Sequence, residues 1–292
     1  MTAAPASLSA GWPVDGLILV DKPTGITSHD AVDLVRRAIG LRKVGHAGTL
    51  DPMATGLLLI GVGRATRLLR FLADLPKLYE GSGVLGVETT TLDADGEVVR
   101  ESPVTATTAE LRRAIRSFVG EIEQVPPAYS AVKVGGQRLY EAARLGRHVV
   151  AAPRSVTVYA FGLRRFDPPR FDVRVRCSGG TYVRSLIADV GTRLGCGAHL
   201  AELRRTAIGP FRVEDARPPD DPGPLLPLES AVGHLMAVTL DPEEARVAVH
   251  GTCLGPAGIT GPYRALGPDG TLIGIYRDDG AKAVPEVILT PS

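Results

Sequence analysis

The most constraining feature of this 292-residue chain is a loop that leads directly into an apolar run. Residues 45–56 place three glycines, two threonines and one proline around a single acid, Asp51. Residues 57–62 (LLLIGV) follow at once and predict a buried strand. Asp51 is therefore expected on a constrained loop anchored in the core, where reactive side chains are commonly presented. A turn whose aspartate bonds its own backbone explains these residues equally well.

The segments around this loop alternate between predicted strands and helices. Apolar runs or strict alternation predict strands at residues 16–20, 57–62, 76–92 and 171–178. Apolar stripes with helical spacing predict helices at residues 30–39, 65–72, 108–119 and 183–194. Gly40 and Gly195 are expected to end the first and the last of these helices.

The C-terminal part differs from the rest in charge and pattern. Residues 213–292 hold five Lys/Arg against twelve Asp/Glu, whereas residues 1–212 hold twenty-eight against twenty. Residues 217–224 have the composition of a linker. Beyond residue 237, short strands are expected at residues 245–249, 264–266, 272–276 and 287–289. A β-rich unit of about 55 residues has a marginal core, so we expect it to pack against the main domain.

Residues 125–155 form a basic stretch of a different kind. From Lys133 to Arg154 the chain carries five Lys/Arg and His148 against a single acid, Glu141, with tyrosines interleaved. Such a stretch is typical of an arm laid over nucleic acid, with cations on phosphates and aromatic rings free to stack. A solvated, irregular insertion is the more common alternative.

Several classes of protein are not indicated. No apolar run approaches the roughly 20 residues needed to cross a bilayer, and no signal peptide is visible. The three cysteines are scattered, the histidines do not cluster, and no nucleotide-binding glycine motif is present. We therefore expect a cytoplasmic protein without metal, membrane segment or nucleotide cofactor.

Five further motifs accompany the loop at residues 45–56, in one order along the chain. They are Lys22-Pro23-x-Gly25-x-Thr27-Ser28, Lys77-x-Tyr79, Val125-Pro126-Pro127-x-Tyr129-Ser130-Ala131-x-Lys133, Cys177-Ser178-x-Gly180-Thr181-Tyr182-x-Arg184 and His199-Leu200-x-x-Leu203-Arg204-Arg205. Together with the loop they resemble the TruB family of tRNA pseudouridine synthases, which isomerise uridine 55 in the tRNA T-loop.

The resemblance implies a fold and a partner. It implies an α+β catalytic domain at residues 1–236, built on a mixed, mostly antiparallel sheet with flanking helices and a thumb-like insertion at about 125–155. Residues 237–292 would form a small β-rich, PUA-like C-terminal domain. The family implies tRNA, through its T-arm, as partner, and neither cofactor nor metal. We expect a monomer.

The resemblance also assigns a chemistry to Asp51. Pseudouridine formation breaks the N1–C1′ bond of uridine, turns the base and rejoins it through C5. Asp51 resembles the essential carboxylate, which either attacks C1′ or removes the C2′ proton. Arg184 resembles its ionic partner, and an opposite charge lowers a carboxyl pKa by roughly 1–3 units while burial raises it.

The remaining expected site residues hold the base or the RNA. Tyr79 resembles the residue that stacks on the base, Leu203 the opposite apolar wall, and Tyr182 a residue that orders the site. Asp93 is expected to bond the uracil edge, although a turn role is as good an explanation. His46 resembles a group that props the RNA loop after base flipping. The expected phosphate contacts are Lys22, Lys133, Arg138 and Arg205.

Two other functions fit the same scaffold. One is a non-catalytic protein that binds or folds tRNA. The other is a relative that acts within a guide-dependent RNA particle. The complete set of Asp51, Tyr79 and Arg184 favours an enzyme over the first, and the chain's own insertion favours independent action over the second.

Overall fold

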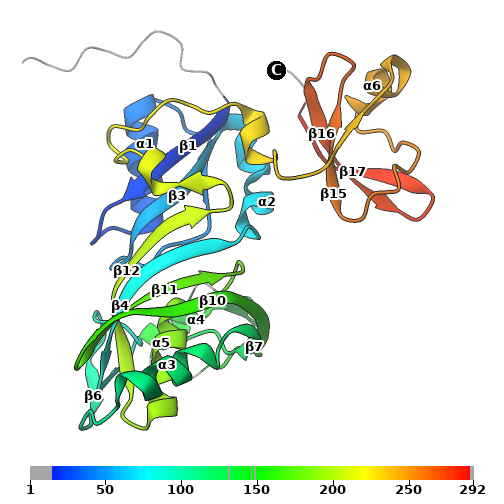
Figure 1. Ribbon diagram of the computed structural model, residues 1–292. Helices are drawn as coiled ribbons and strands as arrows, with labels where there is room; N and C mark the ends of the chain where they lie inside the picture. Colours follow the sequence, from blue (N-terminus) through cyan, green and yellow to red (C-terminus); the bar gives the residue numbers. More distant parts are fainter. Residues whose placement is uncertain (1–14, 131, 146, 148, 290–292) are drawn as a thin grey trace, which may run out of the picture.

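A computed structural model describes residues 15–289, apart from residues 131, 146 and 148 (Figure 1). Residues 1–14, which precede the first predicted strand, and the basic-stretch residue His148 lie outside the described residues. The described chain has three parts. In Figure 1 the first lies above the second, and the C-terminal domain stands beside the first.

The elements follow the chain in that order. The first part contains β1 (Gly16–Lys22), α1 (Ser28–Ile39), β2 (Val44–Ala47), β3 (Thr55–Val62), the 3-10 helix η1 (Gly63–Arg67) and α2 (Leu69–Ala73). The second contains β4 (Lys77–Leu85), β5 (Val87–Thr89), β6 (Val98–Glu101), α3 (Thr108–Arg116), β7 (Gly120–Gln124), β8 (Lys133–Val134), β9 (Gln137–Arg138), α4 (Leu139–Arg144), β10 (Arg154–Asp167), β11 (Arg170–Cys177), α5 (Val183–Leu194), β12 (Ala198–Ile208) and β13 (Phe211–Arg212). The rest contains η2 (Val213–Asp215), η3 (Leu228–Ala231), β14 (Ala237–Thr239), α6 (Pro242–Ala248), β15 (Pro262–Leu266), β16 (Leu272–Asp279) and β17 (Lys282–Ile288).

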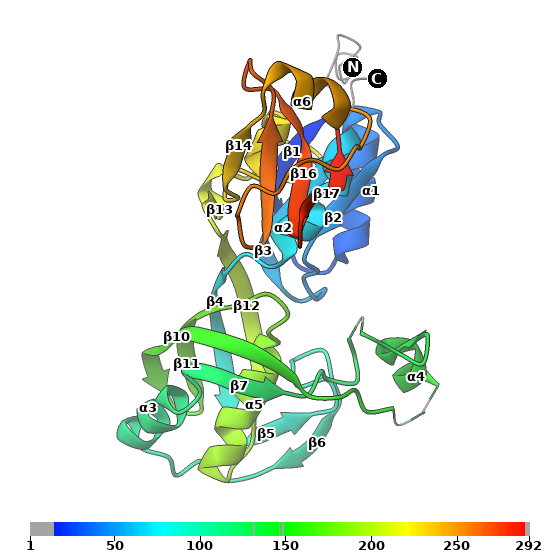
Figure 2. The same ribbon diagram turned by 90° about the vertical axis from the view of Figure 1, so that its right-hand side faces the viewer.

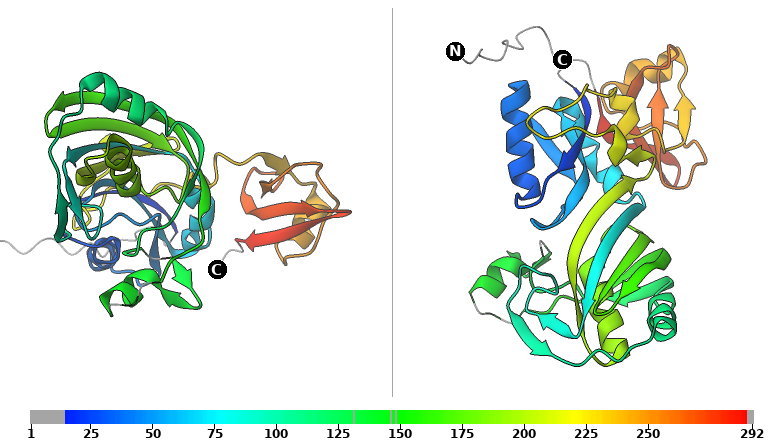
Figure 3. Two further views of the ribbon diagram at one scale, coloured as in Figure 1. Left: turned by 90° about the horizontal axis from the view of Figure 1, so that it is seen from below. Right: turned by 60° about the vertical axis from the view of Figure 1, so that its left-hand side comes forward.

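One nine-stranded sheet joins the first two parts. Its main order is β1-β3-β12-β4-β11-β10-β7, with β2 also paired to β3 and β13 to β12. All these pairs are antiparallel except β12 with β3, which pair in parallel only at Arg204↔Thr55 and Arg205↔Gly56. Two long strands span both parts: β4 runs from the upper part to the lower, and β12 returns antiparallel to it (Figure 3, right). The expected α+β fold with a mostly antiparallel sheet is confirmed.

Local signals in the sequence fix the helix ends. Thr27 caps α1 through a reciprocal capping box with Asp30, and Gly40 ends the helix at a φ of 70°. Thr107 and Glu110 form the same box at the start of α3. The predicted helix at residues 65–72 is instead split into η1 and α2.

The hydrophobic core lies in layers on both faces of the sheet. On one face of β1 and β3, α1 covers Ile18, Val20, Leu58 and Ile60. Beneath α3 and α5 a second cluster includes Tyr79 and the loop residues Leu50 and Ala54. A third cluster joins Leu57 and Leu59 to residues of α2 and of the C-terminal sheet. The loop at residues 45–56 is therefore anchored at both ends in packed core.

The C-terminal domain leans on the first part, as expected. Ile275 and Val287 of its sheet share a core cluster with Phe71 and Leu72 of α2. Arg70 pairs with Glu286 at 2.7 Å, and neighbouring arginines of η1 bond backbone carbonyls at the end of β17. The domain also has a small core of its own, around Tyr263, Ile273 and Tyr276, so this packing adds to a core that is marginal in a unit of this size.

One expectation for the C-terminal third is wrong. Residues 245–249 were expected as a strand, but α6 covers most of them. Asp241 caps that helix, Pro242 occupies its first turn, and Glu244 completes a capping box, so helix-start signals outweigh a short apolar alternation. Residues 217–224, whose composition predicts a linker, begin against the main sheet: the N–H of Arg217 donates to the carbonyl of Leu19, and the carbonyl of Arg217 accepts from the N–H of Asp21.

Gly56 is the residue through which the loop enters the sheet. Its φ is 102°, and a Cβ there would lie 2.3 Å from the carbonyl oxygen of Arg205. We expect Gly56→Ala to destabilise the fold by about 2–5 kcal/mol, from backbone strain plus forced separation of β3 and β12.

The matched control is Gly40→Ala, where φ is also positive but nothing lies within 4 Å of the new Cβ. It should cost only about 1–2 kcal/mol. Urea unfolding followed by circular dichroism compares the two. Equal losses of unfolding free energy in the two variants would contradict the close approach of the backbones at Gly56.

Candidate active site

The loop that carries Asp51 is fastened by the segment that follows β1. The backbone N–H of Gly25 and the ammonium of Lys22 both donate to the carbonyl of Pro52, at 2.9 and 3.3 Å. The Thr24 hydroxyl donates to the carbonyl of Met53 at 3.2 Å. The two polar motifs at residues 22–28 and 45–56 are therefore one structural unit.

Ser28 adds a second fastening point. Its buried hydroxyl accepts from the N–H of Leu50 at 2.8 Å and donates to the same residue's carbonyl at 3.1 Å. Asp51 is thus held from both sides, and its side chain stays 36% exposed.

Lys22 is part of the fastening and not a surface cation. It is fully buried, and its ammonium donates to the carbonyls of Pro23 (2.9 Å) and Ile26 (2.7 Å) as well as Pro52. Burial lowers the pKa of Lys22 to about 8, against an opposing pull from Asp51. The expected phosphate contact is corrected: with its protons directed to three carbonyls, this ammonium does not face RNA.

Arg205 has the same internal character. It is 1% exposed, its Nε donates to the carbonyl of Leu57 at 2.7 Å, and an Nη donates to Gly48 at 3.0 Å. Its guanidinium carbon lies 6.0 Å from the centre of the Tyr79 ring. Arg205 therefore links loop, strand and tyrosine, and its expected phosphate contact is also corrected.

Arg184 brings four segments together. Its guanidinium is 4% exposed and lies 3.4 Å from one carboxylate oxygen of Asp51 and 3.5 Å from Asp93. It also donates to the carbonyl of Thr91 at 3.2 Å and to that of Tyr129 at 2.6 Å. The predicted pairing of Arg184 with Asp51 is present, although the Nε contact lacks hydrogen-bond geometry.

Opposing influences act on the Asp51 carboxyl. Burial raises its pKa, the positive charge of Arg184 lowers it, and the negative charge of Asp93 raises it again. The net direction is upward from 3.8. Of the two effects weighed from the sequence, burial is therefore the larger.

Asp93 is placed differently from its expected role. It is 4% exposed, and its carboxylate accepts from the Thr91 hydroxyl and from the N–H of Asp95, besides facing Arg184. A carboxylate so enclosed does not present itself to a uracil edge. It is both a turn residue and a second anion on Arg184.

Tyr79 and Leu203 lie on neighbouring strands, β4 and β12. Tyr79 is 6% exposed and shares a core cluster with Leu50 and Ala54 of the loop; burial raises its pKa. Leu203 pairs with Gly81 of β4. The two side chains therefore reach the same region as the loop.

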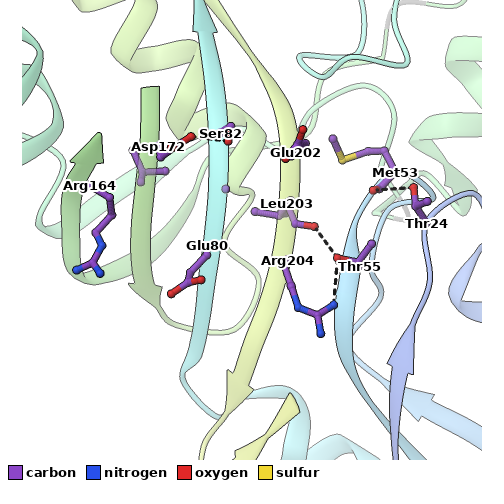
Figure 4. Close-up of a pocket in the computed structure, with 12 residues that line it drawn as sticks. Thr24, Met53, Thr55, Glu80, Ser82, Arg164, Asp172, Glu202, Leu203 and Arg204 are labelled. Carbon is purple, nitrogen blue, oxygen red and sulfur yellow. Dashed lines mark hydrogen bonds between the residues drawn. The ribbon is translucent and has the colours of Figure 1, made fainter. Parts of the chain in front are cut away.

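A pocket of about 610 Å³ adjoins this region (Figure 4). Leu203 and Met53 line it together with charged side chains of the sheet, among them Glu80, Asp172 and Arg204. The Thr55 hydroxyl bonds the carbonyl of Leu203 at 3.5 Å at its edge. Asp51 and Tyr79 do not line it, so this pocket lies beside the candidate site.

Tyr182 is the N-cap residue of α5, two residues before Arg184. Its ring centre lies 5.9 Å from the Arg184 guanidinium carbon. Both backbone groups of Tyr182 are bonded by the side chain of Gln124, at 2.8 and 3.0 Å. Sequence reasoning missed Gln124, because a lone glutamine at the end of a strand carries no chemical signal.

The expected RNA contacts fall in two places. His46, in β2, is half-buried; its Nδ1 has no partner among the described residues, and burial lowers its pKa, which favours the neutral ring. Lys133 is exposed in β8 of the insertion. Arg138 belongs to β9, and its side chain lies outside the described part. Figure 2 shows α4 of this insertion standing out to one side.

The described residues contain neither a metal-binding cluster nor a membrane-spanning helix. No group of three or more His, Cys, Asp or Glu side chains among them has the arrangement of a metal site. Within the same residues, no helix combines the length and apolar character that crossing a bilayer requires.

Family models match most of the chain. A model described as the N-terminal domain of TruB family pseudouridylate synthase matches residues 36–183. A tRNA pseudouridylate synthase B C-terminal model matches residues 184–218, and a tRNA pseudouridine synthase II C-terminal model matches residues 236–290.

Individual proteins are similar over nearly the whole length. A tRNA pseudouridine synthase B of Thermobifida fusca (strain YX) is 46% identical over 291 residues, covering 95% of this chain and 99% of its own. The Mycobacterium sp. (strain KMS) protein of the same name is 46% identical over 287 residues, covering 95% and 97%. A chain in a crystal structure of a Cbf5–Nop10–Gar1 complex superposes with a TM-score of 0.73 at 26% identity, covering 94% of this chain and 85% of that one.

The chain therefore belongs to the TruB family of tRNA pseudouridine synthases, which are isomerases. The resemblance seen in the sequence motifs is confirmed. The fold brings the motif that contains Asp51 next to the motif that contains Arg184.

Arg184 opposes the effect of burial on Asp51. If turnover needs the Asp51 carboxylate, removing this positive charge raises the pKa of Asp51 further, and activity must fall at a higher pH on acidification. We expect Arg184→Gln to lower the single-turnover rate and to move the acid limb of its pH profile upward. Arg246→Gln, which breaks an exposed pair on α6, is the control. An unmoved limb would contradict the pairing.

Lys22 and Lys133 differ in a way that salt dependence reveals. Lys22→Met should lower stability by about 1–3 kcal/mol, because buried carbonyls lose their donor, while the salt slope of RNA binding stays unchanged. Lys133→Met should leave stability unchanged and reduce that slope by about 0.7–1. A reduced slope in Lys22→Met would restore it as a phosphate contact.

Proposed function

We propose that this chain converts uridine 55 in the T-loop of tRNA to pseudouridine, with Asp51 as the essential carboxylate at the ribose. The observation that carries the proposal is the partly exposed Asp51 carboxylate, held on a doubly fastened loop and 3.4 Å from the buried Arg184. Relatives named tRNA pseudouridine synthase B support tRNA as the substrate.

The reaction is an isomerisation, so the chain needs no redox partner or second substrate. The N1–C1′ bond breaks, the uracil turns within the site, and a C5–C1′ bond forms. The C5 proton is lost and N1 gains a proton, which leaves the composition of the RNA unchanged. The protein has to supply a charge at the ribose, a pocket for the detached base and a proton path.

Asp51 supplies the charge by either of two routes. It attacks C1′ as a nucleophile, or it removes the C2′ proton to give a glycal. Both routes start from the carboxylate, which burial disfavours and Arg184 favours. A carboxylate with a raised pKa is also a stronger base and nucleophile than an ordinary aspartate, provided it remains ionised.

Tyr79 and Leu203 are proposed to hold the base. They lie on adjacent strands beside the loop, so a flipped uracil would fit between an aromatic face and an aliphatic wall. The Tyr79 hydroxyl, whose pKa burial raises, would stay protonated at neutral pH, so it could assist the C5 proton transfer only as a relay that releases its own proton as it takes up the one from C5.

The insertion is proposed to bring the RNA. Lys133 is exposed on its hairpin, and the carbonyl of Tyr129 at its base bonds Arg184. The half-buried His46 would fill the space left by the flipped nucleotide. We further propose a catalytic domain at residues 1–236, a C-terminal domain at residues 237–292, and a cytoplasmic monomer as the working form.

Release of tritium from a C5-labelled T-arm RNA tests the function. The wild-type chain should release the label from position 55, and Asp51→Asn should release none while binding the RNA with similar affinity. Absence of release by the wild type would contradict the proposed activity. Loss of both release and binding in Asp51→Asn would instead make Asp51 a structural residue.

A further inference from the structure

Gln124 occupies the junction between the insertion and the catalytic site. It is the last residue of β7 and is paired with Arg154, the first residue of β10, so the two stems of the insertion meet there. Its side chain is 4% exposed. A buried amide at such a junction needs partners for both its oxygen and its nitrogen.

Both partners belong to a single residue. The Gln124 Oε1 accepts from the backbone N–H of Tyr182 at 2.8 Å, and its Nε2 donates to the Tyr182 carbonyl at 3.0 Å. Tyr182 is the N-cap of α5, yet this helix has no side-chain cap bond of its own. Gln124 therefore fixes in space the point from which α5 begins.

Arg184 lies in the turn that Gln124 fixes. It follows Tyr182 by two residues and must meet Asp51 on one side and the carbonyl of Tyr129 on another. Arg184 is thus contacted by the insertion directly, through Tyr129, and indirectly, through Gln124 and Tyr182. No second buried amide among the described residues makes this kind of two-sided bond to the start of α5.

We propose that Gln124 is a positioning residue for the isomerisation: it holds the start of α5 so that Arg184 meets Asp51, and it couples the stem of the insertion to that ion pair. This inference rests on the proposed function of Asp51. Gln124 acts through Arg184 and does not touch the substrate.

Charged groups surround both Asp51 and Gln124. Asp51 is influenced by Arg184 of α5, by Asp93 and Asp95 of the turn after β5, and by Lys22 of β1. Gln124 faces the start of α5, which carries Tyr182 and Arg184, and its partner across the sheet is Arg154. Among these charges, Arg184 favours the ionised form of Asp51 most, so displacing Arg184 makes Asp51 harder to ionise.

Two substitutions of Gln124 give opposite signatures. Gln124→Met keeps the side-chain volume but loses both hydrogen bonds, so Arg184 is held less firmly and Asp51 becomes harder to ionise. The single-turnover rate of this variant, relative to the wild type, therefore falls as the pH is lowered. Gln124→Glu loses its donor when ionised and regains one when protonated, so this variant approaches the wild type as the pH is lowered. At neutral pH both should turn over roughly ten- to a hundredfold more slowly.

The experiment measures single-turnover pseudouridine formation in T-arm RNA by the full-length chain across pH, as the ratio of each variant to the wild type. Rates are normalised to folded protein by circular dichroism, and RNA affinity is measured in parallel. Glu123→Gln, which exchanges the same two side chains at an exposed position of β7 beside Gln124, is the control and should give a flat ratio near one.

Ratios that fall on acidification for Gln124→Met and rise for Gln124→Glu, with unchanged RNA affinity, support the proposal. Flat ratios for both variants, with any loss explained by unfolded protein, overturn it and leave Gln124 a purely structural residue. If the wild type forms no pseudouridine, it is the proposed function that fails, so the two failures are distinguishable.

Discussion

The contact between Asp51 and Arg184 is the constraint on which the arrangement of this protein depends. A buried guanidinium is costly unless its donors are paired, and Arg184 finds partners in the loop, the turn after β5 and the insertion. These segments are far apart in the chain and are brought together by the long sheet. Because Asp51 and Asp93 share the Arg184 cation, the ionisation of Asp51 depends on the positions of the loop, the turn and the insertion.

Two further cations have an internal role that is easily mistaken for RNA binding. Lys22 directs its ammonium to three carbonyls, and Arg205 directs its guanidinium to the carbonyls of Gly48 in the loop and Leu57 in β3. Each holds irregular backbone, whose polar groups require partners wherever it is buried. The loop is therefore fastened by internal hydrogen bonds, and such preorganisation would favour the proposed role of Asp51.

Local signals in the sequence were enough to predict much of the fold and part of the site. The apolar run at residues 57–62, the capping boxes at Thr27 and Thr107 and the terminating Gly40 depend on neighbours in the chain, so they were predictable. The burial of Lys22 and Arg205 depends on where distant strands pass, and a basic residue near an RNA site is expected to face solvent unless that path is known. The strand expected at residues 245–249 failed because the capping signal of Asp241 was overlooked, whereas Gln124 offered no signal at all.

We propose that the Asp51 carboxyl, whose pKa burial raises, stays ionised at neutral pH because Arg184 accompanies it. Titration of the protein labelled with ¹³C at the aspartate side-chain carboxyl carbon, with the resonance assigned through Asp51→Asn, measures this directly. We expect a midpoint above the ordinary 3.8 and full ionisation at pH 7. A midpoint at or below 3.8, or a carboxyl still protonated at pH 7, would contradict it.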